Sequence, residues 1–126
     1  MTGDDTYRGP AANSEPTTAG LVALARQQRP VYYVTYHTYG PYALHPFGCS
    51  GVQASSPDFR TLREMSSEVS ALMEADTPGT WFQFGTPWEV LYAVDGDMDA
   101  WFYGEIGSMG LTFELNGGAP GGFQPD

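Results

Sequence analysis

The sequence predicts an α/β fold, in which helices alternate with strands. Two observations predict it. Between residues 59 and 73, apolar side chains recur at the spacing of an amphipathic helix. Residues 31–37, by contrast, are β-branched or aromatic almost throughout, which is typical of a strand. Aromatic residues make up 14% of the 126 residues, and such large rings favour burial in one small domain over disorder.

The first elements along the chain are a loop, a helix and a strand. Residues 1–16 are polar and rich in turn formers, so we expect an N-terminal loop there. Ser14-Glu15-Pro16 begins a helix that extends to about Gln28, with Ser14 as its N-cap and proline in its first turn. The strand over 31–37 is apolar nearly all along, which predicts a central strand covered on both faces.

A loop and a second helix follow. Residues 38–51 are rich in Gly, Pro and Tyr and are expected to form a loop. Ser56-Pro57-Asp58 begins the second helix, which we expect to continue through Ala75. Its apolar face consists of Phe59, Leu62, Met65, Val69, Leu72 and Met73.

The last part of the chain is more irregular. We expect a short strand over 81–84 and a short helix over 99–105, whereas 88–94 is ambiguous between strand and loop. Residues 111–115 alternate in the manner of a strand. The tail 116–126 is rich in Gly and Pro, so the α/β part of the domain is expected to end at 115.

Charge and cysteine content exclude several classes of function. Fifteen acidic residues against five arginines give a net charge of −10, which argues against a nucleic-acid partner and against binding to anionic membranes. No apolar run is long enough to span a bilayer, and the acidic start of the chain does not resemble a signal peptide. The single cysteine, Cys49, leaves no partner for an intrachain disulfide.

Two residues at the ends of predicted strands could carry chemistry. His37 follows six strand residues, a common position for a site in α/β folds, but the local sequence favours a hydrogen-bonded histidine in a turn. Glu114 lies between Phe113 and Leu115. If it points inward, burial would raise its pKa and suit it to be a general base. If it lies on an edge strand, it needs no functional explanation.

Two further patterns are weaker. Asp95, Asp97 and Asp99 imitate the start of a calcium-binding loop, but Ala100 stands where that loop needs glycine, and Ile106 where it needs glutamate. His45 and Cys49 are four residues apart in a loop, and this spacing alone does not establish a nucleophilic pair. No Gly-rich phosphate loop and no His-Glu-x-x-His motif is present.

Several segments, taken together and in order, resemble one family. Tyr36-His37-Thr38-Tyr39-Gly40 looks like a His-Ser-Tyr motif at a strand end, and Leu111-Thr112-Phe113-Glu114-Leu115 looks like a Phe-Thr-Phe/Ile-Glu-Leu strand. Both motifs are those of zinc carboxypeptidases of the carboxypeptidase A/B type. The other similar segments are 6–10, 13–16, 44–48, 91–93, 99–104 and 121–125. The chain is therefore similar to this family over nearly its whole length.

This resemblance implies the fold and the reaction. The family has an α/β/α sandwich on a mixed sheet, and residues 1–126 would form the C-terminal part of it. Its enzymes hydrolyse the C-terminal peptide bond with one zinc ion held by two histidines and a glutamate. By motif, His37 would be the later zinc histidine. Glu114 would be the general base that activates the zinc-bound water.

The resemblance also implies residues that bind the peptide. Tyr92 would be the mobile tyrosine that closes over the terminal carboxylate, and Tyr39 would line the cleft. Thr38 replaces the family's usual serine. Asp99 falls where the family sets side-chain preference, and an acid there implies a preference for C-terminal Lys or Arg.

Other motifs of the family are not found in this sequence. Neither histidine begins the His-x-x-Glu motif that supplies the other zinc ligands, and the upstream arginines are missing. We therefore expect the C-terminal half of a catalytic domain, cut at both ends, which is inactive and marginally stable alone. Two alternatives stay open: one half of a split enzyme completed by a partner chain or a second copy, and a non-catalytic remnant that binds peptide C-termini. The sequence leaves the compartment open.

Overall fold

The computed structural model describes residue 7 and residues 9–115, in two units that comprise residues 1–30 and 31–126. The first unit contains helix α1, Pro16–Gln28, which ends where the sequence predicted. Its N-cap is Glu15 and not Ser14. The Ser14 hydroxyl donates instead to the Glu15 carboxylate at 3.3 Å, so it does not cap the backbone. Arg29 adopts a left-handed conformation that ends the helix.

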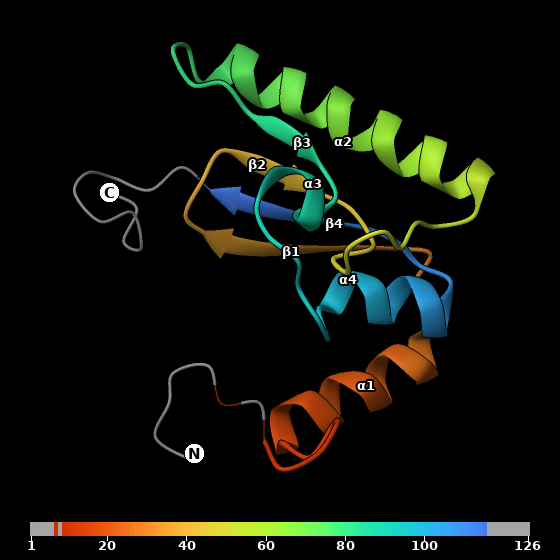
Figure 1. The fold of residues 1–126 in the computed structure, drawn as a ribbon. Helices are drawn as coiled ribbons and strands as arrows, with labels where there is room; N and C mark the ends of the chain where they lie inside the picture. Colours follow the sequence, from red (N-terminus) through yellow and green to blue (C-terminus); the bar gives the residue numbers. More distant parts are fainter. Residues whose placement is uncertain (1–6, 8, 116–126) are drawn as a thin grey trace. The chain divides into compact units, whose positions relative to one another are not determined.

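The second unit contains a mixed four-stranded sheet, which confirms the predicted α/β class (Figure 1). The strands are β1 (Tyr32–Thr38), β2 (Tyr42–Leu44), β3 (Gln83–Gly85) and β4 (Met109–Leu115), in the order β1-β4-β2-β3. β4 pairs with β1 in parallel and with β2 antiparallel. β2 and β3 are parallel to each other.

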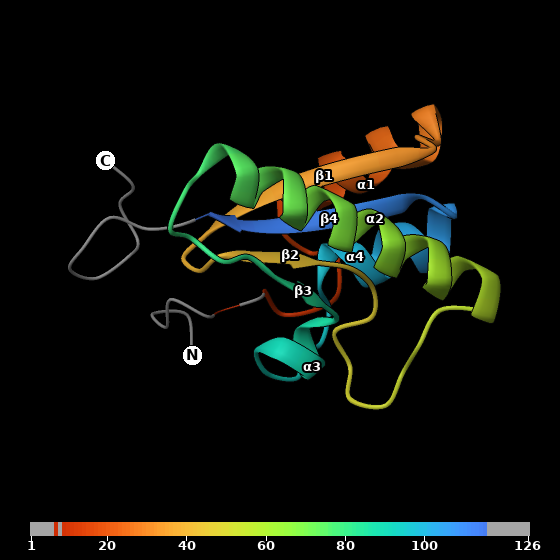
Figure 2. The ribbon, with the colours of Figure 1, turned by 90° about the horizontal axis from the view of Figure 1, so that it is seen from above.

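Helix α2, Ser56–Asp76, covers one face of this sheet, as Figure 2 shows. Its bounds agree with the predicted helix to within one residue. Leu62 is fully buried, and the small side chains of Ser66 and Ser70 are buried on the same helix. Leu72, which the sequence assigned to the apolar face, is exposed. The apolar core beneath the helix consists of Ala43, Leu111 and Phe113, with Val34, Met65, Val69, Met73, Phe84 and Leu115 packed against them.

Short helices lie on the other side of the sheet (Figure 1). They are α4, Met98–Trp101, and the π-helical turn η1, Phe102–Ile106, which together confirm the expected helix over 99–105. The Phe102 ring stacks on Tyr33 of β1 with 4.3 Å between ring centroids. Because strand side chains alternate between faces, Val34 points to α2 whereas Tyr33 points to α4 and η1.

One expectation about the sheet is wrong. The strand over 31–37 was expected at the centre of the sheet, but β1 pairs only with β4 among the described strands. Tyr32 and Tyr36 on it are exposed. The central strand is β4, which is buried from Gly110 to Phe113. Tyrosine-rich composition does not distinguish the two cases, because a tyrosine ring has a polar end that tolerates water.

Two segments between the long elements also differ from expectation. The predicted loop 38–51 contains β2, which is too short to give a periodic pattern. Residues 88–94 begin in neither a strand nor a loop but in helix α3, Pro87–Val90. The Thr86 N–H donates to the Glu89 carboxylate at 3.0 Å, a helix-capping arrangement that the spacing Thr-x-x-Glu signals. The tail 116–126 lies outside the described residues. Within the described part, no helix is long and apolar enough to cross a membrane.

Candidate active site

The pair formed by His37 and Glu114 is the centre of the site. The two residues are register partners at the ends of β1 and β4, so their side chains leave the sheet on the same face. His37 Nδ1 lies 3.8 Å from Glu114 Oε1. Glu114 is thus on the central strand rather than an edge strand, and its side chain is only 16% exposed, against 54% for His37.

The environment of Glu114 suits a proton acceptor. Burial raises the pKa of its carboxyl group, and the nearby His37 imidazole opposes this rise. The second carboxylate oxygen, Oε2, is buried and has no hydrogen-bond partner among the described residues. A desolvated carboxylate with a free oxygen binds a proton more readily than a solvated one.

Asp99 lies deeper on the same face. It is 3% exposed, and both carboxylate oxygens accept hydrogen bonds. Thr112 Oγ1 on β4 donates to Oδ2 at 2.8 Å, and the Tyr33 hydroxyl on β1 donates to Oδ1. Burial raises the pKa of Asp99 to about 6, because desolvation outweighs the stabilising hydrogen bonds from the two hydroxyls.

The other predicted peptide-binding residues lie at the end of β1 and on loops. Thr38 ends β1 opposite Leu115, and Tyr39 follows it, half exposed. The Gly40 N–H donates to the Leu115 carbonyl at 3.0 Å, so this turn stays beside the end of β4 and close to His37. Tyr92 is 69% exposed after α3, and no contact joins it to His37 or Glu114 in the part of the chain that the structure describes.

The three aspartates of the calcium-like pattern have separate partners. Asp95 accepts a hydrogen bond from the Cys49 thiol at 3.2 Å. Asp97 caps helix α4, where its carboxylate accepts from the Ala100 N–H at 2.7 Å. Asp99 accepts from the two hydroxyls described above. The spacing therefore reflects capping and packing.

His45 and Cys49 also interact with different groups. The His45 ring is fully buried, with its edge against the Phe59 ring and its Nδ1 2.9 Å from the Pro46 carbonyl oxygen. Burial lowers the pKa of His45. The hydrogen bond to Asp95 raises the pKa of the Cys49 thiol, which is the reverse of what a thiolate nucleophile needs.

The position of Tyr33 beside Asp99 was not predicted from the sequence. Gly110 is the register partner of Tyr33, and a Cβ at this position would overlap the Tyr33 ring. The missed signal is this glycine, because a glycine inside a strand often marks a close approach of another group.

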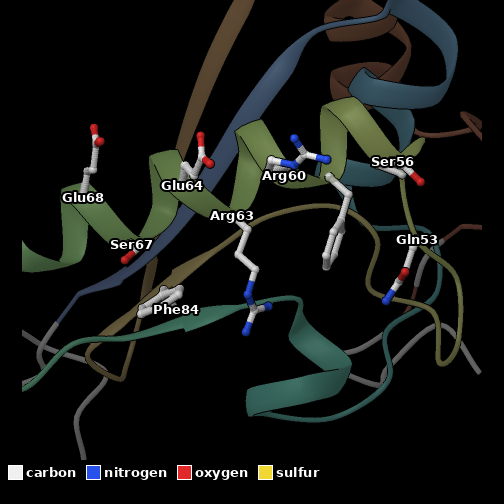
Figure 3. Close-up of a pocket in the computed structure, with 10 residues that line it drawn as sticks. Gln53, Ser56, Arg60, Arg63, Glu64, Ser67, Glu68 and Phe84 are labelled. Carbon is white, nitrogen blue, oxygen red and sulfur yellow. The ribbon is translucent and has the colours of Figure 1, made fainter.

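An open pocket of about 700 Å³ lies on the α2 side of the molecule, away from this site (Figure 3). Arg63 crosses it from α2, with its guanidinium 5.6 Å from the centre of the Phe84 ring. The same guanidinium is paired with the Glu89 carboxylate at 3.0 Å. The Arg63 guanidinium is therefore already paired within the chain.

The described residues do not fit a complete zinc site. A catalytic zinc takes about three protein ligands. His37 is one suitable donor, and Glu114 lies beside it. Within residue 7 and residues 9–115, however, no group of three or more His, Cys, Asp or Glu side chains could hold a metal ion. By themselves, the described residues therefore do not form a catalytic zinc site.

The fold and the site define a layered α/β protein in which a desolvated carboxylate lies beside a histidine at adjoining strand ends. The sequence model of a family described as zinc carboxypeptidase matches residues 2–126, and the chain belongs to this family. This confirms the family resemblance predicted from the motifs.

Individual proteins agree with this assignment. Zinc carboxypeptidase A 1 of Anopheles gambiae is 32% identical over 124 residues, which are 94% of this chain and 28% of that protein. Carboxypeptidase B of Canis lupus familiaris is 32% identical over 120 residues, 89% of this chain and 27% of that protein. The chain therefore spans little more than a quarter of the length of these relatives.

Solved structures show the same fold. Bovine thrombin-activatable fibrinolysis inhibitor, in complex with tick carboxypeptidase inhibitor, aligns with a TM-score of 0.82 and 26% identity. The alignment covers 93% of this chain and 40% of that one. Carboxypeptidase A from Helicoverpa armigera, at 20% identity, shares the fold with a TM-score of 0.84 over 98% of this chain and 30% of its own.

Proposed function

We propose that this chain contributes the general-base side of a metallocarboxypeptidase site, with His37 as a zinc ligand and Glu114 as the base. The observation that carries the proposal is the register pairing of these two residues, 3.8 Å apart at the ends of β1 and β4. The family to which the chain belongs supports it independently. The substrate class is peptides with a free C-terminal carboxylate.

In this proposal, Glu114 moves the proton. Its carboxylate accepts a proton from the attacking water and later passes it to the amine of the leaving residue. The raised pKa of Glu114 favours both steps, because the protonated form must persist between them. The Oε2 atom is buried and unpartnered, and this desolvation is what increases the proton affinity of the carboxylate.

The peptide-binding roles follow the family motif. Tyr92 would close over the terminal carboxylate, which its exposed position on a loop permits. Thr38 and Tyr39 would line the cleft beside His37. Asp99 would give a preference for a C-terminal Lys or Arg, because its charge complements theirs. The bovine neighbour was solved with a carboxypeptidase inhibitor, which agrees with a ligand of this class.

We also propose that hydrolysis needs further ligands from outside residues 1–126, since one histidine cannot hold a catalytic zinc. A preceding segment or a complementing chain carrying His-x-x-Glu would supply them. The one-sided pairing of β1 is compatible with either source. Among the described strands only β4 pairs with β1, so the other edge of β1 can accept one more strand.

The experiment combines metal content, binding and turnover. The 126-residue chain is titrated with zinc and with a peptide ending in Arg, alone and together with a segment that carries His-x-x-Glu. We expect turnover only in the mixture. Glu114→Gln should reduce this turnover by about a hundredfold or more, whereas peptide binding should be unchanged. Glu64→Gln, on the exposed face of α2, is the matched control.

Two outcomes would contradict the proposal. Full turnover with Glu114→Gln would exclude this residue as the base. Stoichiometric zinc and turnover by the 126-residue chain alone would show that it needs no further ligands.

A further inference from the structure

The Tyr33 side chain is fixed from three directions. Its ring occupies the space above Gly110, where any Cβ would overlap it. The ring is stacked on Phe102 with an angle of 14° between the planes. Its hydroxyl donates to Asp99 Oδ1. These three contacts restrict the ring and place its hydroxyl against the Asp99 carboxylate.

The Asp99 carboxylate is consequently held between two strands. Tyr33 on β1 donates to one oxygen, and Thr112 on β4 donates to the other at 2.8 Å. With 3% of the residue exposed, most lone pairs of the carboxylate face protein rather than solvent. Any cationic group that reaches Asp99 meets a carboxylate that already accepts two hydrogen bonds.

We propose that Tyr33 is a positioning residue that fixes Asp99 and limits how strongly this site distinguishes a cationic C-terminal side chain from a neutral one. This inference rests on the proposed function, because it treats Asp99 as the group that meets the substrate's side chain. It adds a residue outside the segments in which the family motifs were recognised.

The physical reason concerns the geometry of carboxylate recognition. A guanidinium binds a carboxylate best through two parallel N–H···O bonds, one to each oxygen. The Tyr33 hydroxyl already uses Oδ1, so a guanidinium must share this oxygen or displace the hydroxyl. Removal of the hydroxyl alone leaves Oδ1 free and increases the negative potential that a cation meets.

The test compares two peptides that differ only in charge. One ends in arginine and the other in citrulline, which is the neutral isostere of arginine. Binding of both to the full chain is measured by calorimetry at a pH well above the Asp99 pKa of each protein, so that Asp99 is ionised in the parent and in the variant. Tyr33→Phe should raise the arginine-to-citrulline ratio of affinities by about fivefold to tenfold. An unchanged or lower ratio would overturn the proposal.

A second readout tests the contact without any peptide. The carboxyl carbon of Asp99 is titrated by NMR, and its resonance is assigned by its loss in Asp99→Asn. The Tyr33 hydrogen bond lowers the pKa of Asp99, so Tyr33→Phe should raise that pKa further. An unchanged pKa would refute the positioning role. Tyr36→Phe is the control, because Tyr36 lies on the same strand, exposed, with its ring against Phe113.

An amidated form of the arginine peptide, measured in the same calorimetry, separates this inference from the proposed function. If the chain binds the amidated and the free peptide equally, it does not recognise C-termini and the proposed function fails. The NMR titration then decides the role of Tyr33 by itself. Because phenylalanine keeps the ring stacked on Phe102, we expect the variant to fold.

Discussion

Asp99→Asn should change how the stability of the protein depends on pH. Burial raises the pKa of this carboxyl from 3.8 to about 6, so the folded state binds its proton more tightly than the unfolded state. The stability that protonated Asp99 contributes is fully present below pH 3.8 and is lost as the pH rises through about 6. Above that pH, the ionised group destabilises the fold by about 3 kcal/mol, from about 1.4 kcal/mol per pKa unit.

The variant lacks this titration. Its amide is neutral at every pH, so any hydrogen bond that it loses with Tyr33 or Thr112 changes stability equally at all pH values. The stability of Asp99→Asn relative to the parent should therefore rise by about 2 kcal/mol between about pH 4 and pH 8. Titrating groups that do not interact with Asp99 occur in both proteins and cancel in the difference.

Urea unfolding followed by circular dichroism at several pH values measures this difference. Asp58→Asn is a control with the opposite sign. Hydrogen bonds from the Tyr103 and Ser55 hydroxyls lower the pKa of Asp58, so its contribution to stability is lost as the pH falls. The relative stability of Asp58→Asn should thus decrease as the pH rises. A relative stability of Asp99→Asn that does not vary with pH would refute the argument from burial.

Two further perturbations test other parts of the packing. Burial lowers the pKa of His45, so the parent protein loses stability as the pH falls below about 6.5. The stability of His45→Phe relative to the parent should therefore rise below that pH in the same urea experiment. A constant difference between the two proteins would show that His45 is not buried as a neutral ring. Gly110→Ala should cost about 1–3 kcal/mol in thermal unfolding, because its methyl group overlaps the Tyr33 ring. Gly104→Ala, with open space around the added carbon, should cost nothing, and equal losses in both variants would contradict the predicted overlap.

The sequence predicted the regular elements better than their arrangement. Helix α2 was predicted to within one residue, because its apolar positions repeat with helical spacing over many residues. β2 has only three residues, so no pattern could reveal it. The edge position of β1 was also not predictable, since it depends on which strands pair and not on the composition of one strand.

The site residues show the same difference between local sequence patterns, which were predictable, and tertiary contacts, which were not. The motifs singled out His37 and Glu114, and the parallel register of β1 and β4 then brought them together. Tyr33 was not singled out, because its role depends on contacts with Phe102 and Asp99, which are 69 and 66 residues away in the chain. Only tertiary structure shows that an ordinary strand tyrosine lies over a glycine and donates to a buried acid.

The two acidic residues of the site have an electrostatic property in common. Asp99 and Glu114 are both carboxylates with raised pKa values on one face of the sheet, and burial is the main cause for each. The His37 imidazole is the basic group that opposes this rise at both. A cation that reached this face would lower both pKa values and recover part of the desolvation energy. This face is thus complementary to positive charge, which is why binding of a cationic side chain there should strengthen as Asp99 ionises above about pH 6.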